Sequence, residues 1–224
     1  MSYGFRVKNT NSELQIDGNY INYVYNEQSG SLTLNGLSTI TLTNPTPFPP
    51  IVLLRPTSAS DRACGVFDYT YSSPNYTHVR VFGGQQAFDS GTCSFDYKIY
   101  TVTDVNSSDT YGFRVRNEQG KIVFDAGKIP FKILEVGTAT IDSTYTHSSH
   151  SDPFYVFSPW LSAVVGFRFA GQGPVYRLVG GIAKVSSTST IGRWVIVGQL
   201  GLTNMNFTDY QATTFTLIVC DSGA

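Results

Sequence analysis

The sequence predicts an all-β fold made of two tandem antiparallel β-sandwich (or small-barrel) domains that are related by internal duplication. The first reason is a repeat, because residues 3–9 read YGFRVKN and residues 111–117 read YGFRVRN. The second is the alternation of apolar and polar residues over most of the chain, which is typical of half-buried strands. The third is composition: the chain has 14 Tyr, 15 Phe and 21 Gly, and aromatic residues favour strands while glycine favours turns.

The repeat extends past these seven residues. Between residues 3–17 and residues 111–125, seven of fifteen positions are identical. The ends of the two halves also match, because residues 95–104 resemble residues 213–221. The offset between the copies has grown there from 108 to 117, so 117 − 108 = 9 residues were gained inside the second half.

The duplication gives the domain organisation. A polar stretch over residues 105–110 separates the first unit from the second copy of the repeat. We therefore expect an N-terminal unit of residues 1–108 and a C-terminal unit of residues 109–224, each of a size that suits one small domain.

Each unit opens with a predicted β-hairpin. In the first copy, alternation over residues 4–8, a polar stretch at 9–12 and renewed alternation over 13–17 indicate two strands and a short turn. In the second copy Gly120 stands in the turn, where a left-handed residue would close it. A third strand is expected at residues 21–25 and at the equivalent residues 131–134.

The remaining strands follow from apolar alternation, with turn residues between them. In the first unit we expect strands at residues 31–34, 39–43, 51–54, 65–71, 78–82 and 95–102. In the second unit we expect them at 154–157, 163–169, 175–179, 181–185, 194–197 and 214–220. Residues 45–50 contain four prolines, which predicts an exposed loop or rigid connector, because proline cannot pair in a central strand.

The charge of the chain limits the kinds of partner that we expect. The net charge of -1 predicts no basic surface for nucleic acid or anionic lipid. Only 14% of residues are charged, so Ser, Thr, Asn and Tyr must cover much of the surface. Such a surface suits the binding of sugars and water-mediated contacts with other proteins. It is equally compatible with the surface of an ordinary β-protein.

We expect the protein to be made and folded in a cytosol. The N-terminus lacks the basic and apolar segments of a secretory signal, and no stretch reaches the roughly 18 apolar residues of a membrane helix. Cys64, Cys93 and Cys220 are therefore expected to be thiols. A bridge between Cys64 and Cys93 is the alternative.

The sequence predicts no catalytic, cofactor-binding or metal site. The nucleophile elbow, the phosphate-binding loop and the metalloprotease helix are missing. A metal site at His147, His150 and Asp152 is less favoured than a solvated polar loop, because an i, i+3 pair in a loop does not face one point. The carboxylates that a glycosidase pair would need are interpreted as turn residues (Asp61, Asp68, Asp89, Asp96).

Five tyrosines are candidate contact residues, because they lie in or beside polar loops where amphipathic rings often mediate contacts. The alternative is that they cap the ends of the sandwich. The five are Tyr69, Tyr71, Tyr76, Tyr145 and Tyr155.

Residues 111–127, YGFRVRNEQGKIVFDAG, resemble a recurring element of small tail-tip and tail-fibre-associated proteins of tailed bacteriophages. In that family a Tyr-Gly-aliphatic strand passes through an Asn/Gly turn and returns on a strand that ends in an aspartate. Here the element occurs at residues 3–18 and 111–127. The resemblance implies a non-enzymatic structural component of a tail tip or fibre assembly, located in the virion and assembled in the host cytoplasm.

The resemblance also implies the partners. These are other tail proteins and further copies of the chain, with a homotrimer expected from the symmetry of tails. No nucleic acid, membrane insertion or cofactor is expected. The alternative is a receptor-binding module that contacts a host glycan or surface protein through residues 62–77 or 144–157. A depolymerising enzyme of the tail-spike kind is the weakest of the three hypotheses.

Overall fold

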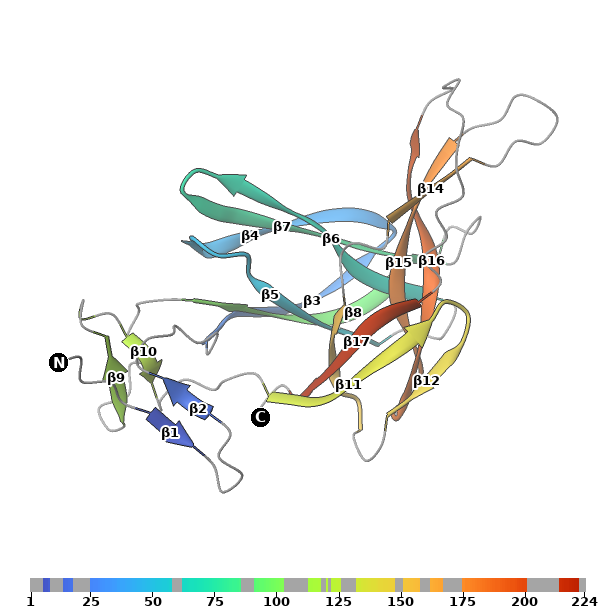
Figure 1. Ribbon diagram of the computed structural model, residues 1–224. Coiled ribbons are helices and arrows are strands. Elements are labelled where there is room, and N and C mark those ends of the chain that lie inside the picture. The colour runs from blue at the N-terminus through green and yellow to red at the C-terminus, as the bar shows by residue number, and fades with distance from the viewer. Residues whose placement is uncertain are drawn as a thin grey trace.

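The predicted all-β antiparallel sandwich is confirmed in the computed structural model. The structure describes residues 6–8, 14–17, 25–57, 62–85, 91–102, 113–117, 120, 122–125, 132–147, 151–157, 162–166, 175–200 and 214–221. Within these residues every helix-or-strand element is a strand, and the named strands all pair antiparallel. Most of the strands form two sheets that face each other (Figure 1).

The two sheets have a simple strand order. The six-stranded sheet contains, in order, β11 (Lys132–Thr140), β17 (Thr214–Asp221), β13 (Phe154–Phe157), β5 (Ile51–Pro56), β8 (Cys93–Thr101) and β3 (Tyr25–Leu34). The seven-stranded sheet contains β12 (Thr144–Thr146), β16 (Ser189–Leu200), β15 (Val175–Ser186), β6 (Arg62–Ser72), β7 (Asn75–Gln85) and β4 (Gly36–Thr46), and β14 (Ser162–Gly166) pairs with β15.

The two halves of the chain have the same connectivity. In the first half β3 pairs with β8, which pairs with β5, while β4 pairs with β7, which pairs with β6. In the second half β11, β17 and β13 repeat the first pattern, and β12, β16 and β15 repeat the second. Among the strands that the structure describes, β14 alone has no counterpart in the other half. This shared order supports the duplication across the long stretches where the two sequences no longer match.

The two halves join through equivalent strands, along a line that we call the seam. In the six-stranded sheet β5 pairs with β13 at Leu54 and Tyr155. In the seven-stranded sheet β6 pairs with β15, where Cys64 and Ala63 face Ile182 and Ala183. Antiparallel pairing of equivalent strands is the arrangement expected when two copies of one unit meet about an approximate twofold axis. Both sheets therefore continue across the boundary at 108/109, so the two units share one sandwich.

The duplicated hairpins form two small sheets of their own. Strand β1 (Arg6–Lys8) pairs with β2 (Leu14–Asp17), and β9 (Arg114–Arg116) pairs with β10 (Ile122–Asp125). The registers agree, because Arg6 faces Asp17 in the first copy and Arg114 faces Asp125 in the second. Figure 1 shows both hairpins on the side of the molecule where the N-terminus lies, apart from the two large sheets.

The turn of the second hairpin closes as the sequence predicts, and an ion pair joins its two strands. Gly120 has a φ of 77°, and its N–H donates to the carbonyl of Asn117 at 2.9 Å. The guanidinium of Arg114 donates from Nε to Oδ2 of Asp125 at 3.0 Å, and that aspartate is buried. A buried carboxylate requires such a partner, so the Arg114–Asp125 pair ties the two strands of the second hairpin together.

The main hydrophobic core lies between the two sheets and draws on both units. Alternate residues of β5, Val52 and Leu54, belong to this core. The second unit supplies Tyr155, Ile182, Leu217 and Val219 to the same cluster as the following residues of the first unit: Ile40, Leu42, Val52, Leu54, Cys64, Val66, Val79, Val81, Cys93, Phe95 and Ile99. The core is therefore undivided across the seam.

A second, smaller apolar cluster lies at the seam and is built around Phe82. This side chain is fully buried with Ala63, Ala183, Ile191 and Val195. Its ring covers two glycines on neighbouring strands. A Cβ atom on Gly65 would overlap the ring, and one on Gly181 would lie 3.0 Å from it and 2.8 Å from the carbonyl oxygen of Cys64. Glycine at both positions lets one aromatic ring lie across the strands that join the units.

Several strand predictions are confirmed and two need correction. Residues 154–157 form β13 as predicted, and residues 31–34, 39–43, 51–54 and 65–71 all lie within strands. Residues 175–179 and 181–185 were predicted as separate strands but belong to the single strand β15, and Gly181 makes room for the neighbouring backbone of Cys64 rather than for a turn. The proline-rich loop is shorter than predicted, since β4, an edge strand that tolerates proline, runs through Pro45 to Thr46.

Candidate functional site

The candidate site is the end of the β6–β7 hairpin. We define the tyrosine tip as Tyr69, Tyr71 and Tyr76 together with Phe48 of the adjacent loop. Ser72 pairs with Asn75 across the turn, so Tyr71 and Tyr76 are brought opposite each other on neighbouring strands. Figure 1 shows this hairpin extending away from β15 and β16.

The three tyrosine rings support one another. The centroids of Tyr71 and Tyr76 are 5.1 Å apart with an interplanar angle of 60°, and those of Tyr69 and Tyr76 are 6.3 Å apart at 85°. Aromatic pairs prefer such edge-to-face geometry. Tyr69 and Tyr76 also pack against the main core, whereas Tyr71 is 55% exposed. The inner two rings therefore fix the position of the outer one.

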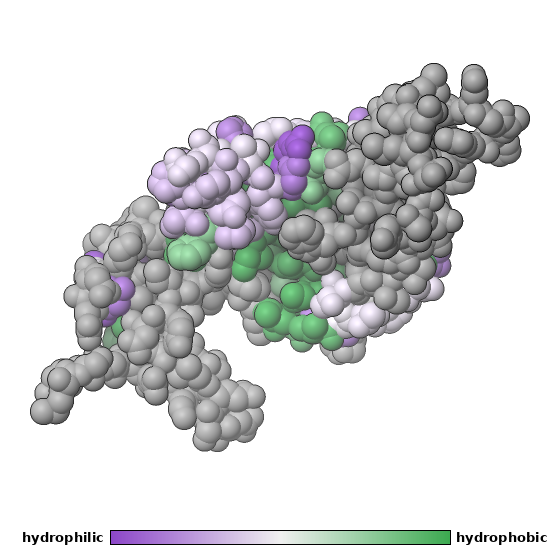
Figure 2. Space-filling model, turned by 45° about the horizontal axis from the view of Figure 1, so that its top comes forward, coloured by the Kyte–Doolittle hydropathy of each residue, from purple (hydrophilic) through white to green (hydrophobic). Residues whose placement is uncertain are grey.

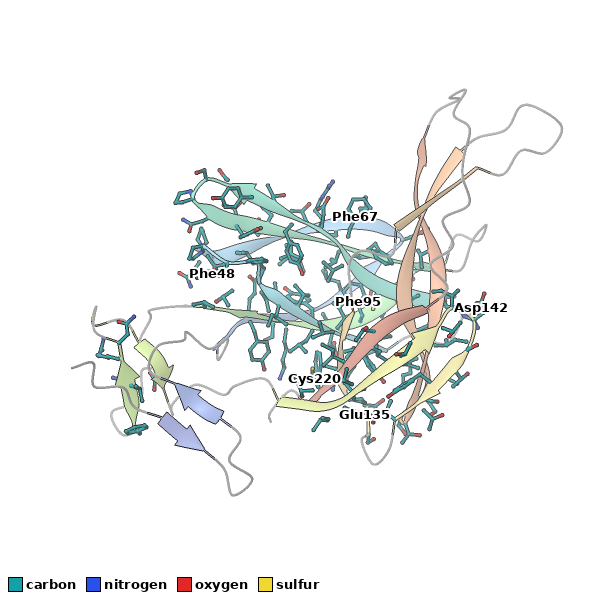
Figure 3. All side chains as sticks on the ribbon, viewed as in Figure 1. Phe48, Phe67, Phe95, Glu135, Asp142 and Cys220 are labelled. Atoms are coloured by element: carbon teal, nitrogen blue, oxygen red, sulfur yellow. The ribbon has the colours of Figure 1, made fainter. Side chains whose placement is uncertain are left out.

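Phe48 belongs to the loop that follows β4, the strand next to the hairpin. Thr46 of β4 is the register partner of Tyr76, so the loop that follows β4 starts beside the hairpin. The N–H of Phe48 donates to Oγ1 of Thr46 at 3.4 Å, and the Phe48 side chain is 45% exposed. Figure 3 shows Phe48 at the same end of the sandwich as the β6–β7 turn. Two large aromatic residues are thus accessible at one end of the molecule.

The tip carries no formal charge. Residues 69–77 and 43–50 contain no Asp, Glu, Lys or Arg. The nearest charges along the hairpin are Asp68 and Arg80, which form an ion pair with Nε of Arg80 2.6 Å from Oδ1 of Asp68. Figure 2 shows the end of this hairpin, at the upper left, as a pale and weakly hydrophilic lobe. Protein-binding surfaces are often rich in exposed aromatic rings that are surrounded by hydroxyl and amide groups.

Tyr145 does not belong to the tip. It lies on β12, its hydroxyl donates to the carboxylate of Glu135 on β11, and its ring covers Gly137, where a Cβ atom would overlap it. Partial burial and the neighbouring Glu135 carboxylate raise the pKa of Tyr145 to about 12. Both the ring and the hydroxyl of Tyr145 are therefore engaged within the molecule.

Tyr155 is part of the core rather than the surface. It is 5% exposed, and its hydroxyl lies 2.8 Å from Nε2 of His147. Burial, with a further contribution from the charge of Asp152, raises the pKa of Tyr155 above its ordinary value. Of the five tyrosines that the sequence suggested, the structure thus gathers Tyr69, Tyr71 and Tyr76 and separates Tyr145 and Tyr155 from them.

The two internal tyrosines predict an alkaline loss of stability. Each folded-state pKa is raised, so the folded protein holds a proton that the unfolded chain releases above its pKa of about 10. We expect the free energy of unfolding to fall as the pH rises from about 10 through 12, measured by urea unfolding at a series of pH values. Tyr145→Phe should make this decline shallower. An equally steep decline in that variant would contradict the role given to Tyr145.

His147 corrects the sequence interpretation. It was expected in a solvated loop but is 1% exposed, because its hydrogen bond with Tyr155 satisfies a polar atom inside the protein. His150 lies outside the described residues, and Asp152 pairs with Lys184 at 2.6 Å. Among the residues that the structure describes, no three His, Cys, Asp or Glu side chains are grouped as a metal site would require.

The carboxylates interpreted as turn residues are also placed differently. Asp68 and Asp96 lie within β6 and β8, where each is paired with an arginine of a neighbouring strand, Arg80 and Arg55 respectively. The Oγ of Ser31 also donates to Asp96 at 2.6 Å. Asp61 and Asp89 lie outside the described residues. The two described carboxylates thus bind arginines rather than facing each other.

Comparisons with protein-family models, with curated proteins and with solved structures gave no significant match for this chain. In the described part of the chain, no helix has the length and apolar character needed to cross a membrane.

Proposed function

We propose that this chain is a non-enzymatic structural component of a bacteriophage tail tip or tail fibre assembly. The observation that carries the proposal is the hairpin of residues 3–18 and 111–127, whose two copies fold with the same register outside the two large sheets. A surface element that a chain retains twice in the same form suits a protein that docks to repeated partners. Tail proteins, which are assembled with threefold or sixfold symmetry, are partners of that kind.

The hairpins are the expected docking elements. In the second copy Phe113 is 48% exposed, while Val115 and Asp125 on the same hairpin are buried. The ion pair between Arg114 and the buried Asp125 fixes the hairpin geometry, so the exposed ring is presented by a defined structure. In this arrangement the hairpins hold the chain to other tail proteins in the virion, and a homotrimer is the expected assembly by analogy with tail symmetry.

The proposal is tested on phage particles produced with this gene. An antibody against the chain should detect it in purified virions, and immunogold labelling should locate it at the tail tip or fibres. Particles made without the gene should lack complete tails. Infectious, complete particles that do not contain the chain would contradict the proposal.

A second candidate function is receptor binding, and the tyrosine tip favours it. Tyr71 and Phe48 are exposed at one end of the sandwich. The segments that carry them, residues 69–77 and 43–50, contain no charged residue. Aromatic residues are enriched among those that dominate binding energy at protein interfaces. In this role the tip contacts a host surface glycan or protein, while the hairpins dock to the tail.

The tip gives a direct mutational prediction. In particles that carry Tyr71→Ser, host adsorption should fall by about 30-fold, because loss of one aromatic anchor costs about 2 kcal/mol of binding. The melting temperature of the purified variant should stay unchanged, since Tyr71 is 55% exposed.

Val136→Ser is the matched control for Tyr71→Ser. Val136 is 60% exposed on β11, away from the tip, and its substitution should leave adsorption unaltered. Normal adsorption by the Tyr71 variant would remove the tip from the receptor-binding hypothesis. It would leave the structural role in the tail untouched.

A further inference from the structure

Two cysteines meet between the two sheets. Cys64 lies on β6 of the seven-stranded sheet, and Cys93 begins β8 of the six-stranded sheet. Both side chains are 0% exposed and belong to the same core cluster. Gly83 of β7 is the register partner of Cys64. A Cβ atom added to Gly83 would lie 3.3 Å from the Cβ of Cys93, which is a tight contact. The backbone next to Cys64 therefore approaches Cys93 closely at this end of the sandwich.

The two thiols interact directly. Their side chains are hydrogen-bonded to each other, and both are in the thiol form without a bridge. Burial raises the pKa of Cys64 well above its ordinary value, and the neighbouring Cys93 raises it further. The two cysteines lie on opposite sheets and in one core cluster, which is the placement that a disulfide between sheets requires, because such a bridge joins side chains that already face each other.

Cys220 provides an internal comparison. It lies on β17, in a separate apolar cluster with Leu53, Tyr100 and Phe154. Its Sγ contacts the carbonyl oxygen of Ile218 at 3.9 Å, and burial raises its pKa to about 12. Cys220 and the cysteine pair thus share the property of burial, but only Cys64 and Cys93 have each other as neighbours.

We infer that Cys64 and Cys93 are the site of a reversible disulfide that joins the two sheets covalently when the protein meets a small-molecule disulfide. One cysteine thiolate attacks a sulfur of the oxidant, forms a mixed disulfide and releases one small thiol. The other cysteine then attacks the protein sulfur, closes the Cys64–Cys93 bond and releases the second small thiol. Two electrons pass to the oxidant, and the two cysteine protons end on the released thiols.

The structure sets the rate and the effect of this reaction. Because both thiols are buried and the pKa of Cys64 is raised by that burial, exchange requires transient opening and accelerates as the pH rises. The closed bond links residues 64 and 93, a loop whose closure is expected to raise the melting temperature by roughly 10 °C for a chain of this size.

The test uses the full chain and oxidised glutathione. After incubation the protein is unfolded, alkylated with iodoacetamide and digested for mass spectrometry. We expect Cys220 to be alkylated and the peptides of Cys64 and Cys93 to be joined. The melting temperature should rise, and dithiothreitol should reverse both changes. Cys220→Ser should behave like the wild type, whereas Cys64→Ser and Cys93→Ser should not form the bond.

The wild-type peptide map decides the question even if a serine variant fails to fold. Alkylation of all three cysteines after prolonged oxidation would overturn the inference. So would a bridge that includes Cys220, or glutathione that remains attached to Cys64 or Cys93 without closure. None of these results depends on the function proposed above.

Discussion

Replacing Phe82 with alanine is expected to lower the free energy of unfolding by about 3–5 kcal/mol, the usual cost of removing a large buried aromatic side chain. Phe82 is fully buried, and its ring lies across Gly65 and Gly181 on the two strands that join the units. Its loss would leave a cavity at the seam and expose the backbone of β6 and β15. Urea unfolding of the full chain measures the effect.

A double-mutant cycle makes this prediction specific. Gly65→Ala should cost about 1–3 kcal/mol in the wild type, because the added methyl group overlaps the Phe82 ring. In the Phe82→Ala background that ring is gone, so the same substitution should cost much less. Thr39→Ala, on the exposed side of β4, serves as a control whose effect should add independently. Equal costs of Gly65→Ala in both backgrounds would contradict the arrangement.

Residues 1–108 expressed alone are expected to self-associate. Removal of the second unit takes β13 and β15 away from β5 and β6. It also removes Tyr155 and Ile182 from the shared core. Strand edges left open in this way are templates for pairing with another chain, and the same edges can pair with those of a second fragment about a twofold axis.

Light scattering after size-exclusion chromatography measures the mass of the fragment. Its melting temperature should rise with protein concentration, as expected when folding is linked to association. The full chain at matched concentration is the control, because its β5 and β6 edges are already paired. A monomeric fragment with a cooperative, concentration-independent melt would instead show that the N-terminal unit folds independently, as the sequence-based division predicts.

Local patterns in the sequence were sufficient to predict the repeated hairpins and to select Tyr69, Tyr71 and Tyr76 as candidate contact residues. The sequence did not separate these three from Tyr145 and Tyr155, because the pairing of β6 with β7 that gathers them was not predicted. The repeated alternation and Gly120 predicted the hairpin in the second copy, which forms with the predicted turn.

The seam could not be predicted in the same way, because it depends on strands far apart in the chain. The pairing of Leu54 with Tyr155 spans about a hundred residues and leaves no local periodicity. A polar loop also gives no sign that the protein will cover it. Tyr155 and His147 therefore appeared accessible in sequence, although each satisfies the other's hydrogen bond inside the core. Gly181 was interpreted as part of a turn for the same reason, since the neighbours that require glycine there, Cys64 and Phe82, belong to distant strands.

The unmatched strand β14 covers part of one edge of β15. It pairs with β15 at residues 175–179, on the edge that β6 occupies only at residues 182 and 183. The first unit connects β5 to β6 with residues 57–61 alone, whereas residues 158–174 separate β13 from β15. Strand β14 thus occupies part of an edge of β15 that a strand from another chain would otherwise find open.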